Sequence, residues 1–327
     1  MKRLVSVLIL LLCAAGVWAE TSFSIGPVLN WSWADIREYV ITYPSFEKLS
    51  ELDWDAHNVW QYGVKTELTH NRFVFTGDIM MAAETESGLM QDYDWFYLLV
   101  NNPDHPTDMF TEFSEHEITL YQKNLINLTA GWKVVNRKNF ALTLGGSFQY
   151  LKTYLKGHDG YVQHSCYDDR NDVGYTNQNV SPYDPDRTKY PVSGPAIWYQ
   201  QEIESLWFDV RTDFILSSVF TLSAEAGISP WQIYDCDDYH YYMGSTQYVW
   251  YYDKPKSTLM YRGLLSVSWN FGKRSSLILS GDVQYLPYAD GNSYKHTSAD
   301  SLYQYAQLGA TDYLGWDVSL SYRIRIF

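Results

Sequence analysis

The stretch INLTAGWKVVNRKNFALTLGGSFQY, residues 126–150, decides the fold class of this chain. Apolar residues occupy every second position from Ile126 to Val134 and again from Phe140 to Leu144, with small or polar residues between them. Successive side chains of a β-strand point to opposite faces, so this spacing predicts two strands that are apolar on one face. The polar residues 136–139 predict a tight turn, and the two strands are therefore predicted to pair as an antiparallel hairpin.

The same alternation recurs along most of the chain, for example in Trp60–Leu68 and in Leu277–Tyr285. Short turns alternate with long polar segments, which we interpret as loops: residues 35–56, 84–115, 154–196, 232–257 and 287–311. Short turns on one side and long loops on the other are typical of an outer-membrane barrel. We therefore predict an all-β fold, a transmembrane antiparallel up-and-down β-barrel of about ten strands, with short periplasmic turns and long extracellular loops.

The composition narrows the possible partners. The formal net charge is −14, which argues against a nucleic-acid partner, because sequence-independent binding needs stripes of Lys and Arg. The chain contains 29 Tyr and 13 Trp, more than an ordinary soluble core needs. Both side chains suit a membrane–water interface, where the ring is apolar and its polar tip stays hydrated. Outer-membrane lipid is therefore the expected surrounding of the barrel.

The N-terminus indicates the compartment. Lys2-Arg3 precedes an apolar core from Leu4 to Ala15, and Val17-Trp18-Ala19 supplies the small residues of a cleavage site. We interpret residues 1–19 as a signal peptide and residues 20–327 as a single outer-membrane β-barrel domain. A lipoprotein signal ending at Cys13 is the alternative, which the bulky Leu before this cysteine disfavours.

Two further cysteines, Cys166 and Cys236, lie in polar segments of the chain. In an exported protein they could pair with each other, but two cysteines in a chain of this length make no disulfide framework. After the signal peptide there is no apolar run of about 18 residues, so no membrane-spanning helix is predicted.

Two acidic clusters suggest chemistry. Asp92 and Asp94 lie in one long polar segment, and Asp238 and His240 form an Asp-x-His couple in another. A pair of carboxylates facing an Asp-His couple could hold and activate a water molecule. The alternatives are solvated loop carboxylates or a divalent-cation site, and Asp235, Asp237 and Asp238 could equally form a Ca²⁺ loop.

Four short motifs, in order, resemble those of the omptin family of outer-membrane aspartyl-type proteases. They are Ser50-Glu51-Leu52-Asp53-Trp54, Met90-Gln91-Asp92-Tyr93-Asp94-Trp95, Ser114-Glu115-His116 and the ungapped stretch Trp231–His240. Together with the signal peptide, the strand count and the terminal Phe327, the resemblance covers essentially the whole mature chain. It implies a monomeric surface endopeptidase without a cofactor or metal, acting on protein or peptide substrates.

The resemblance also implies roles for individual residues. Asp238 would orient and charge His240, the general base, while Asp92 and Asp94 would hold the nucleophilic water. The family has a carboxylate two residues before the Asp of Asp-x-His, in the pocket for a basic P1 side chain, and here that position is Cys236. The second pocket carboxylate maps to Glu38 or Asp35, so Glu38 and Cys236 are the candidate substrate-binding residues.

Ser114 and His116 could suggest a serine nucleophile, but no third orienting partner is evident, and we interpret them as loop or supporting residues. The lipopolysaccharide motif of the family is reduced to Phe148-Gln149-Tyr150-Leu151-Lys152, which puts the dependence on lipid in question.

The sequence thus predicts an outer-membrane endopeptidase with its active site facing the exterior, cutting near basic residues. The main alternative is an omptin-shaped barrel that acts as an adhesin or binding protein. A pore is disfavoured, because inward charged residues such as Lys65, Glu67 and Arg262 predict a filled polar lumen in a narrow barrel.

Overall fold

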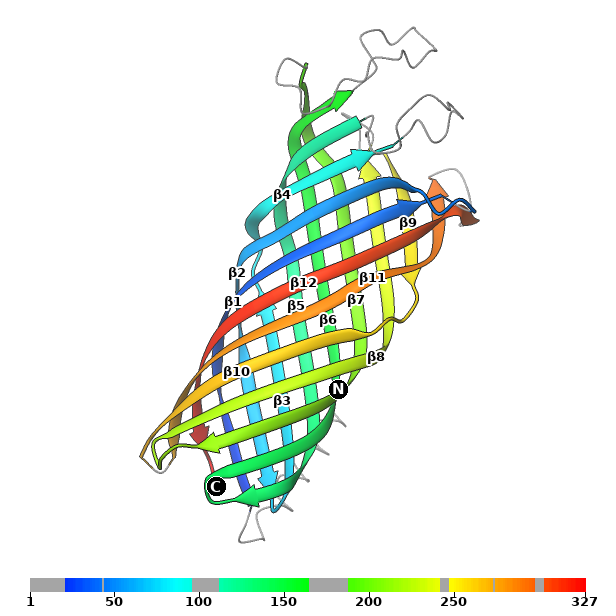
Figure 1. Ribbon diagram of the computed structural model, residues 1–327. Helices are drawn as coiled ribbons and strands as arrows, with labels where there is room; N and C mark the ends of the chain where they lie inside the picture. Colours follow the sequence, from blue (N-terminus) through cyan, green and yellow to red (C-terminus); the bar gives the residue numbers. More distant parts are fainter. Residues whose placement is uncertain are drawn as a thin grey trace, which may run out of the picture.

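A computed structural model describes residues 21–42, 44–95, 112–164, 188–241, 247–272, 274–297 and 303–327. These residues form a tall barrel of antiparallel strands (Figure 1). Among them no helix is long and apolar enough to cross a membrane. The twelve strands are β1 (Thr21–Ile41), β2 (Lys48–His70), β3 (Phe73–Ala82), β4 (Thr85–Asp94), β5 (Glu112–Arg137), β6 (Phe140–His164), β7 (Tyr190–Ile215), β8 (Phe220–Tyr241), β9 (Tyr248–Pro255), β10 (Met260–Phe271), β11 (Ser275–Thr297) and β12 (Tyr303–Arg325).

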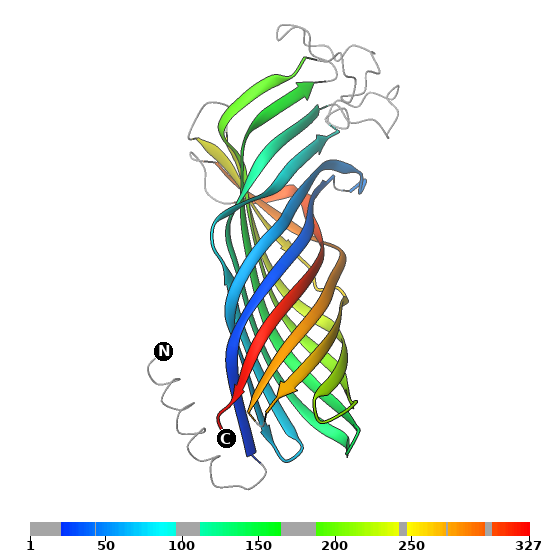
Figure 2. The ribbon, with the colours of Figure 1, turned by 90° about the vertical axis from the view of Figure 1, so that its left-hand side faces the viewer.

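The sheet closes on itself because β1 pairs with both β2 and β12 (Figure 2). Two positions in the ring are each shared by two strands. β3 and β4 both lie between β2 and β5, and β9 and β10 both lie between β8 and β11. The twelve described strands therefore fill ten positions around the barrel, in agreement with the predicted count of about ten.

The wall of the lower barrel has an apolar outer face and a polar inner face. Outward side chains such as Leu128, Phe208 and Leu265 are 53%, 66% and 63% exposed, as expected for a surface that lipid covers. The inner face carries ion pairs, among them Arg262–Asp209 at 2.6 Å and Arg323–Glu67 at 3.0 Å. Charges of opposite sign thus pair across the interior, as the prediction of a polar lumen with inward charged residues expects.

The prediction of long loops is wrong over much of their length. β5 begins at Glu112, β6 continues to His164 and β8 continues to Tyr241, so the strands rise well beyond the apolar band. Backbone pairing continues there, but the outer face is no longer apolar, and the alternation that reveals a strand in the sequence fades. Residues 96–111, 165–187, 242–246 and 298–302, which belong to the same predicted loops, lie outside the described residues.

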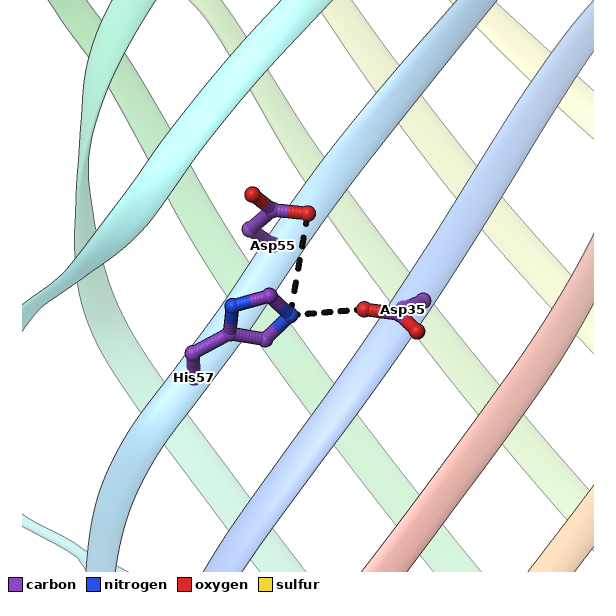
Figure 3. A group of neighbouring side chains, drawn as sticks. All are labelled: Asp35, Asp55 and His57. Carbon is purple, nitrogen blue, oxygen red and sulfur yellow. Dashed lines mark hydrogen bonds and ion pairs between the residues drawn. The ribbon is translucent and has the colours of Figure 1, made fainter.

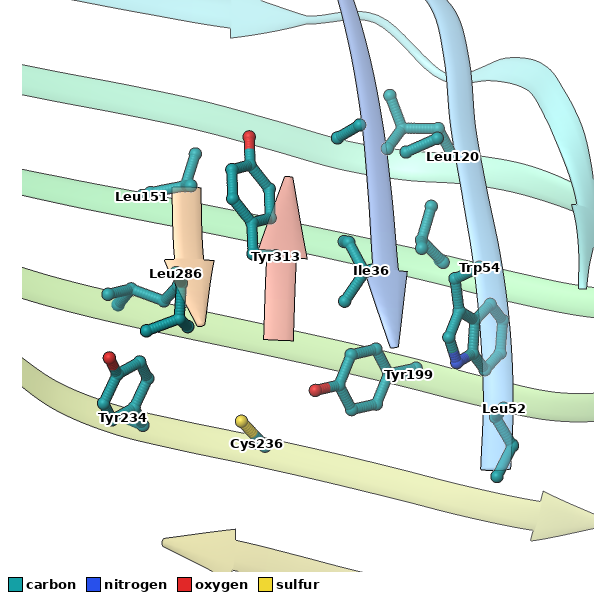
Figure 4. Packing of buried hydrophobic residues seen from close by; sticks show 14 of the residues in the cluster. Ile36, Leu52, Trp54, Leu120, Leu151, Tyr199, Tyr234, Cys236, Leu286 and Tyr313 are labelled. Atoms are coloured by element: carbon teal, nitrogen blue, oxygen red, sulfur yellow. The ribbon is translucent and has the colours of Figure 1, made fainter. Parts of the chain in front are cut away.

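A buried apolar cluster fills the barrel interior at the base of this upper part (Figure 4). Trp54 and Tyr199 are stacked within it, with their ring centroids 5.6 Å apart. Strands from different sides of the barrel contribute to it, including β1, β2, β7 and β8. Its members include Ile36, Leu52, Trp54, Met90, Tyr199, Tyr234 and Cys236. The cluster forms a solid floor, on which the residues of the barrel mouth stand.

Candidate active site

The predicted catalytic residues lie on strands and meet in one cavity. Asp92 and Asp94 are on β4, and Asp238 and His240 are on β8. All four line a cavity of about 180 Å³ in the barrel mouth, together with Glu38 of β1. Each pair is spaced by two residues, so both members point to the same face of the strand.

The apolar floor positions these side chains through the same period of two. Met90 precedes Asp92 by two residues, Cys236 precedes Asp238 and Ile36 precedes Glu38. The first member of each couple belongs to the buried cluster, and the second lines the cavity. Packing of the apolar residues therefore fixes the strand register, and the register sets the acidic residue one step above the floor.

The Asp238–His240 couple has the geometry of an oriented base. Oδ2 of Asp238 lies 2.5 Å from Nε2 of His240. When Asp238 is ionised, Nε2–H donates to it, and Nδ1 remains as the nitrogen that can accept a proton. Asp238 is 4% exposed, whereas the His240 side chain is 34% exposed. The carboxylate is thus held inside the wall, and the imidazole faces the cavity.

Burial sets the protonation of the couple. It lowers the pKa of His240 below its ordinary value, which the charge of Asp92 opposes. The imidazole is therefore neutral near pH 7 and can act as a base. Burial raises the pKa of Asp238 well above its ordinary range, and repulsion by Asp253 and Asp92 adds to this.

Asp92 and Asp94 form a second acidic pair facing the same cavity. Ser50 donates a hydrogen bond from Oγ to Oδ1 of Asp92 at 3.3 Å. Burial raises the pKa of Asp92 to about 6, although interaction with His240 lowers it. The pKa of Asp94 is raised further, by burial and then by the charge of Asp92. Such a pair shares a proton near neutral pH, and its titration belongs to both residues.

Comparisons with known proteins show the family of the chain and its fold. The model of the Omptin family matches residues 20–323. The chain belongs to the Omptin family. The structure of the outer membrane protease OmpT from Escherichia coli has a TM-score of 0.79 at 16% identity, covering 94% of this chain and 98% of that chain. This likeness confirms the predicted barrel fold.

Other matches are more distant. The translocator domain of the autotransporter NalP from Neisseria meningitidis is 8% identical with a TM-score of 0.35, covering 97% of this chain and 94% of that chain. A Pseudomonas aeruginosa FadL homologue is 10% identical with a TM-score of 0.31, covering 93% of this chain and 90% of that chain. No curated protein matches this Omptin chain.

The two candidate pocket residues of this Omptin chain differ in position. Glu38 is 3% exposed and lines the cavity, whereas the alternative residue Asp35 is 53% exposed on the outer face of β1. Cys236 is buried in the apolar floor and is not among the residues that line the cavity. Asp235 and Asp237 point outward, where they accept hydrogen bonds from Tyr252 and Trp250.

Sequence reasoning missed Asp253. This residue of β9 lines the cavity, as do Tyr251 and Ser293, and it is the cross-strand partner of Cys236. Burial raises its pKa to about 7. The aromatic run 248–252 would have indicated a strand, but the pairing of that strand with β8 depends on a turn whose length the sequence pattern does not show.

Ser114 and His116 lie on β5, next to the cavity but not lining it. Ser114 is the cross-strand partner of Asp92, and its Oγ is 3.1 Å from Nε2 of His116. The other ring nitrogen of His116 contacts the backbone carbonyl of Asp159. Both side chains are buried, and burial lowers the pKa of His116. Their position supports the interpretation of Ser114 and His116 as supporting residues.

Within the described residues, one group has the spacing of metal ligands, Asp35, Asp55 and His57 (Figure 3). None of the three lines the cavity. Nε2 of His57 is 2.6 Å from Oδ1 of Asp35 and 3.6 Å from Oδ1 of Asp55. His57 also stacks on Trp33, with ring centroids 4.0 Å apart. The alternative of a Ca²⁺ loop is not supported, because Asp235 and Asp237 point away from Asp238.

Cys166 and the signal peptide lie outside the described residues. Cys236 is a free, buried cysteine, and its pKa is raised well above the ordinary value by burial.

Proposed function

We propose that this Omptin-family chain is an outer-membrane endopeptidase that hydrolyses peptide bonds with an activated water molecule. The observation that carries the proposal is the Asp238–His240 couple, which shares one cavity with Asp92 and Asp94. The cavity opens at the end of the barrel opposite the short turns, so we place it on the cell exterior.

The chemistry follows from the two acidic pairs. Asp92 and Asp94 accept hydrogen bonds from the water and place it beside His240. Nδ1 of His240 takes one proton from the water as its oxygen bonds to the carbonyl carbon of the peptide. Asp238 stabilises the imidazolium that results. When the C–N bond breaks, the imidazolium returns the proton to the leaving amine, and the products are a carboxylic acid and an amine.

The carboxyl groups of the cavity favour cationic substrates. Five carboxyl groups line it, those of Glu38, Asp92, Asp94, Asp238 and Asp253, and the whole chain carries −14. Burial and mutual repulsion raise the pKa values of these groups, and a cationic side chain that enters the cavity would favour their ionised form and pair with it. We therefore propose cleavage of polypeptides near Lys or Arg, by a monomer that needs neither a cofactor nor a metal.

A non-proteolytic adhesin is the second candidate. Binding a cationic surface would need the negative charge but not a histidine at 2.5 Å from a buried carboxylate. The test is a peptide library incubated with the refolded protein, with the cut sites read by mass spectrometry. Cuts next to basic residues that disappear in Asp238→Asn support the peptidase, and binding of the library without any cut supports the adhesin.

A further inference from the structure

Asp253 occupies a deep position in the mouth that the catalytic scheme does not use. It lies on β9, and its cross-strand partners are Cys236 on one side and Ser293 on the other. The residue is 5% exposed and lines the cavity. Tyr251, which lies two residues before Asp253 on β9, is the cross-strand partner of Asp238. Asp253 therefore lies level with Cys236, two residues closer to the apolar floor than the catalytic Asp238.

The carboxyl group of Asp253 rests in a space made by a glycine of β12. A Cβ atom at Gly309 would lie 2.1 Å from the carboxyl carbon of Asp253, so no other residue fits there without displacing it. Ser293 donates a hydrogen bond to the same carboxyl group and lowers its pKa. These contacts hold the group in one place, as a specificity determinant requires.

Three buried carboxyl oxygens of residues that line the cavity have no donor, one of them Oδ1 of the catalytic Asp238 and the other two outside the catalytic scheme. Oδ1 of Asp253 and Oε2 of Glu38 each lack a hydrogen-bond partner among the described residues, and both side chains are at least nine-tenths buried. An unsatisfied buried carboxylate is costly, and a bound cation with several N–H groups would satisfy both oxygens. A guanidinium or ammonium group on a flexible side chain has those donors.

We propose that Asp253, together with Glu38, binds the basic side chain of the substrate residue next to the bond that is cut. This proposal rests on the proposed peptidase function. Cys236 stands where the family has a pocket carboxylate, and the cross-strand neighbour of Cys236 supplies that carboxylate from β9. Discrimination in favour of basic residues is then kept, although the sequence of β8 alone predicts that it is weakened.

The test compares kcat/KM for peptides that differ only in Arg, Lys, Gln or norleucine at the P1 position. In Asp253→Asn, the preference for Arg over Gln is expected to fall about 10- to 100-fold, because a charge-assisted hydrogen bond is lost. The rate on the Gln peptide is expected to stay within a few-fold of wild type. Asp235→Asn, on the outer face of β8, is the matched control and should keep the wild-type ratio.

A double variant separates charge from structure. Cys236→Asp with Asp253→Ser moves the carboxylate from β9 to β8 and should restore the preference for Arg that Asp253→Ser alone loses. An unchanged Arg-to-Gln ratio in Asp253→Asn would overturn the proposal. An equal loss on both peptides would also overturn it, because that result means a structural role.

Binding provides a readout that is independent of cleavage. Fluorescence anisotropy of a labelled Arg peptide and its norleucine analogue is measured with His240→Ala and with His240→Ala/Asp253→Asn. The role of Asp253 is supported if His240→Ala binds the Arg peptide more tightly than the norleucine analogue and His240→Ala/Asp253→Asn does not. This result would hold even if wild type cuts neither peptide and the proposed function fails. Equal binding of the two peptides to both proteins overturns the role of Asp253.

Discussion

At the scale of single residues, the mouth is built from carboxyl groups that resist ionisation. The pKa of Asp253 is about 7 in the folded protein because burial disfavours the charge, against an ordinary value of 3.8. Between these two pH values the folded chain holds a proton that the unfolded chain has lost. Its contribution to stability is therefore full below about pH 4 and is lost as the pH rises towards 7.

Asp253→Asn should consequently stabilise the barrel at alkaline pH. At pH 8 we expect the free energy of unfolding to rise by about 2–4 kcal/mol, because the neutral amide carries no cost of burying a charge. At pH 4 the two proteins should be equally stable. Urea unfolding of both proteins in detergent micelles at the two pH values checks this. A variant that is less stable than wild type at pH 8 would contradict it.

The acid limb of the activity profile should report Asp92. Its pKa is about 6, and kcat/KM should fall below that pH as Asp92 loses the charge that holds the water. Burial lowers the pKa of His240 below its ordinary value, which moves protonation of the imidazole to lower pH. Ser50→Ala removes the hydrogen bond that favours ionised Asp92, so the acid limb should move to higher pH. A pH profile of kcat/KM for both proteins tests this, and an unmoved limb would separate Asp92 from catalysis.

At the scale of elements, the strands continue above the apolar band and carry the site. Period-two alternation made the lower strands predictable, as in 126–150, because one face meets lipid and the other the interior. Above the band, residues such as Asp235 and Asp237 replace apolar side chains on the outer face of β8. The sequence there no longer alternates between apolar and polar residues, and it therefore predicts a loop. The inner face still alternates, from Tyr234 through Cys236 to Asp238.

The pairing of β9 with β8 could not be predicted for a different reason. It depends on the turn between the strands, and a change of one residue would turn Asp253 to the outer face. The motifs along the chain predict Asp92, Asp94, Asp238 and His240, because these residues lie in short runs that resemble a family. Asp253 has no such motif, and only the register of β8, β9 and β11 places it in the cavity.

β12 contributes to the site through Gly309, which has no side chain and so leaves room for the carboxyl group of Asp253. Gly309→Ala places a Cβ 2.1 Å from the Asp253 carboxyl carbon and should displace that carboxyl group. We expect cleavage of an Arg peptide to fall about tenfold or more, because the displaced carboxyl group no longer makes its charge-assisted hydrogen bond with the basic side chain. Gly281→Ala on β11 is the matched control, since its nearest neighbour would lie 3.8 Å away. Equal activity of the two variants on the Arg peptide would contradict this account of β12.

At the scale of the whole molecule, the barrel separates a lipid-facing wall, a paired polar interior, an apolar floor and an acidic mouth. The site stands on strands of a closed sheet, so replacing a mouth residue should leave the barrel intact. This division allows a variant to be tested for activity and for folding separately.

The mouth should work without a metal ion. The group of described residues with metal-ligand spacing, Asp35, Asp55 and His57, lies on the outer wall, away from the cavity. We expect peptide cleavage to be unchanged by EDTA, because His240 and not a metal ion lowers the barrier to proton removal from the water. The rate is measured with EDTA and again after excess Ca²⁺ is restored. Loss with EDTA and recovery with Ca²⁺ would show that the acidic pairs hold a cation.

The most direct test of the central claim is kcat/KM of His240→Ala on a peptide that wild type cuts. His57→Ala serves as the control, and circular dichroism and the thermal midpoint verify that both variants are folded. Removing a general base should lower the rate by about 10²- to 10⁴-fold, while His57→Ala stays near wild type. A folded His240→Ala barrel with activity within a few-fold of wild type would contradict the account.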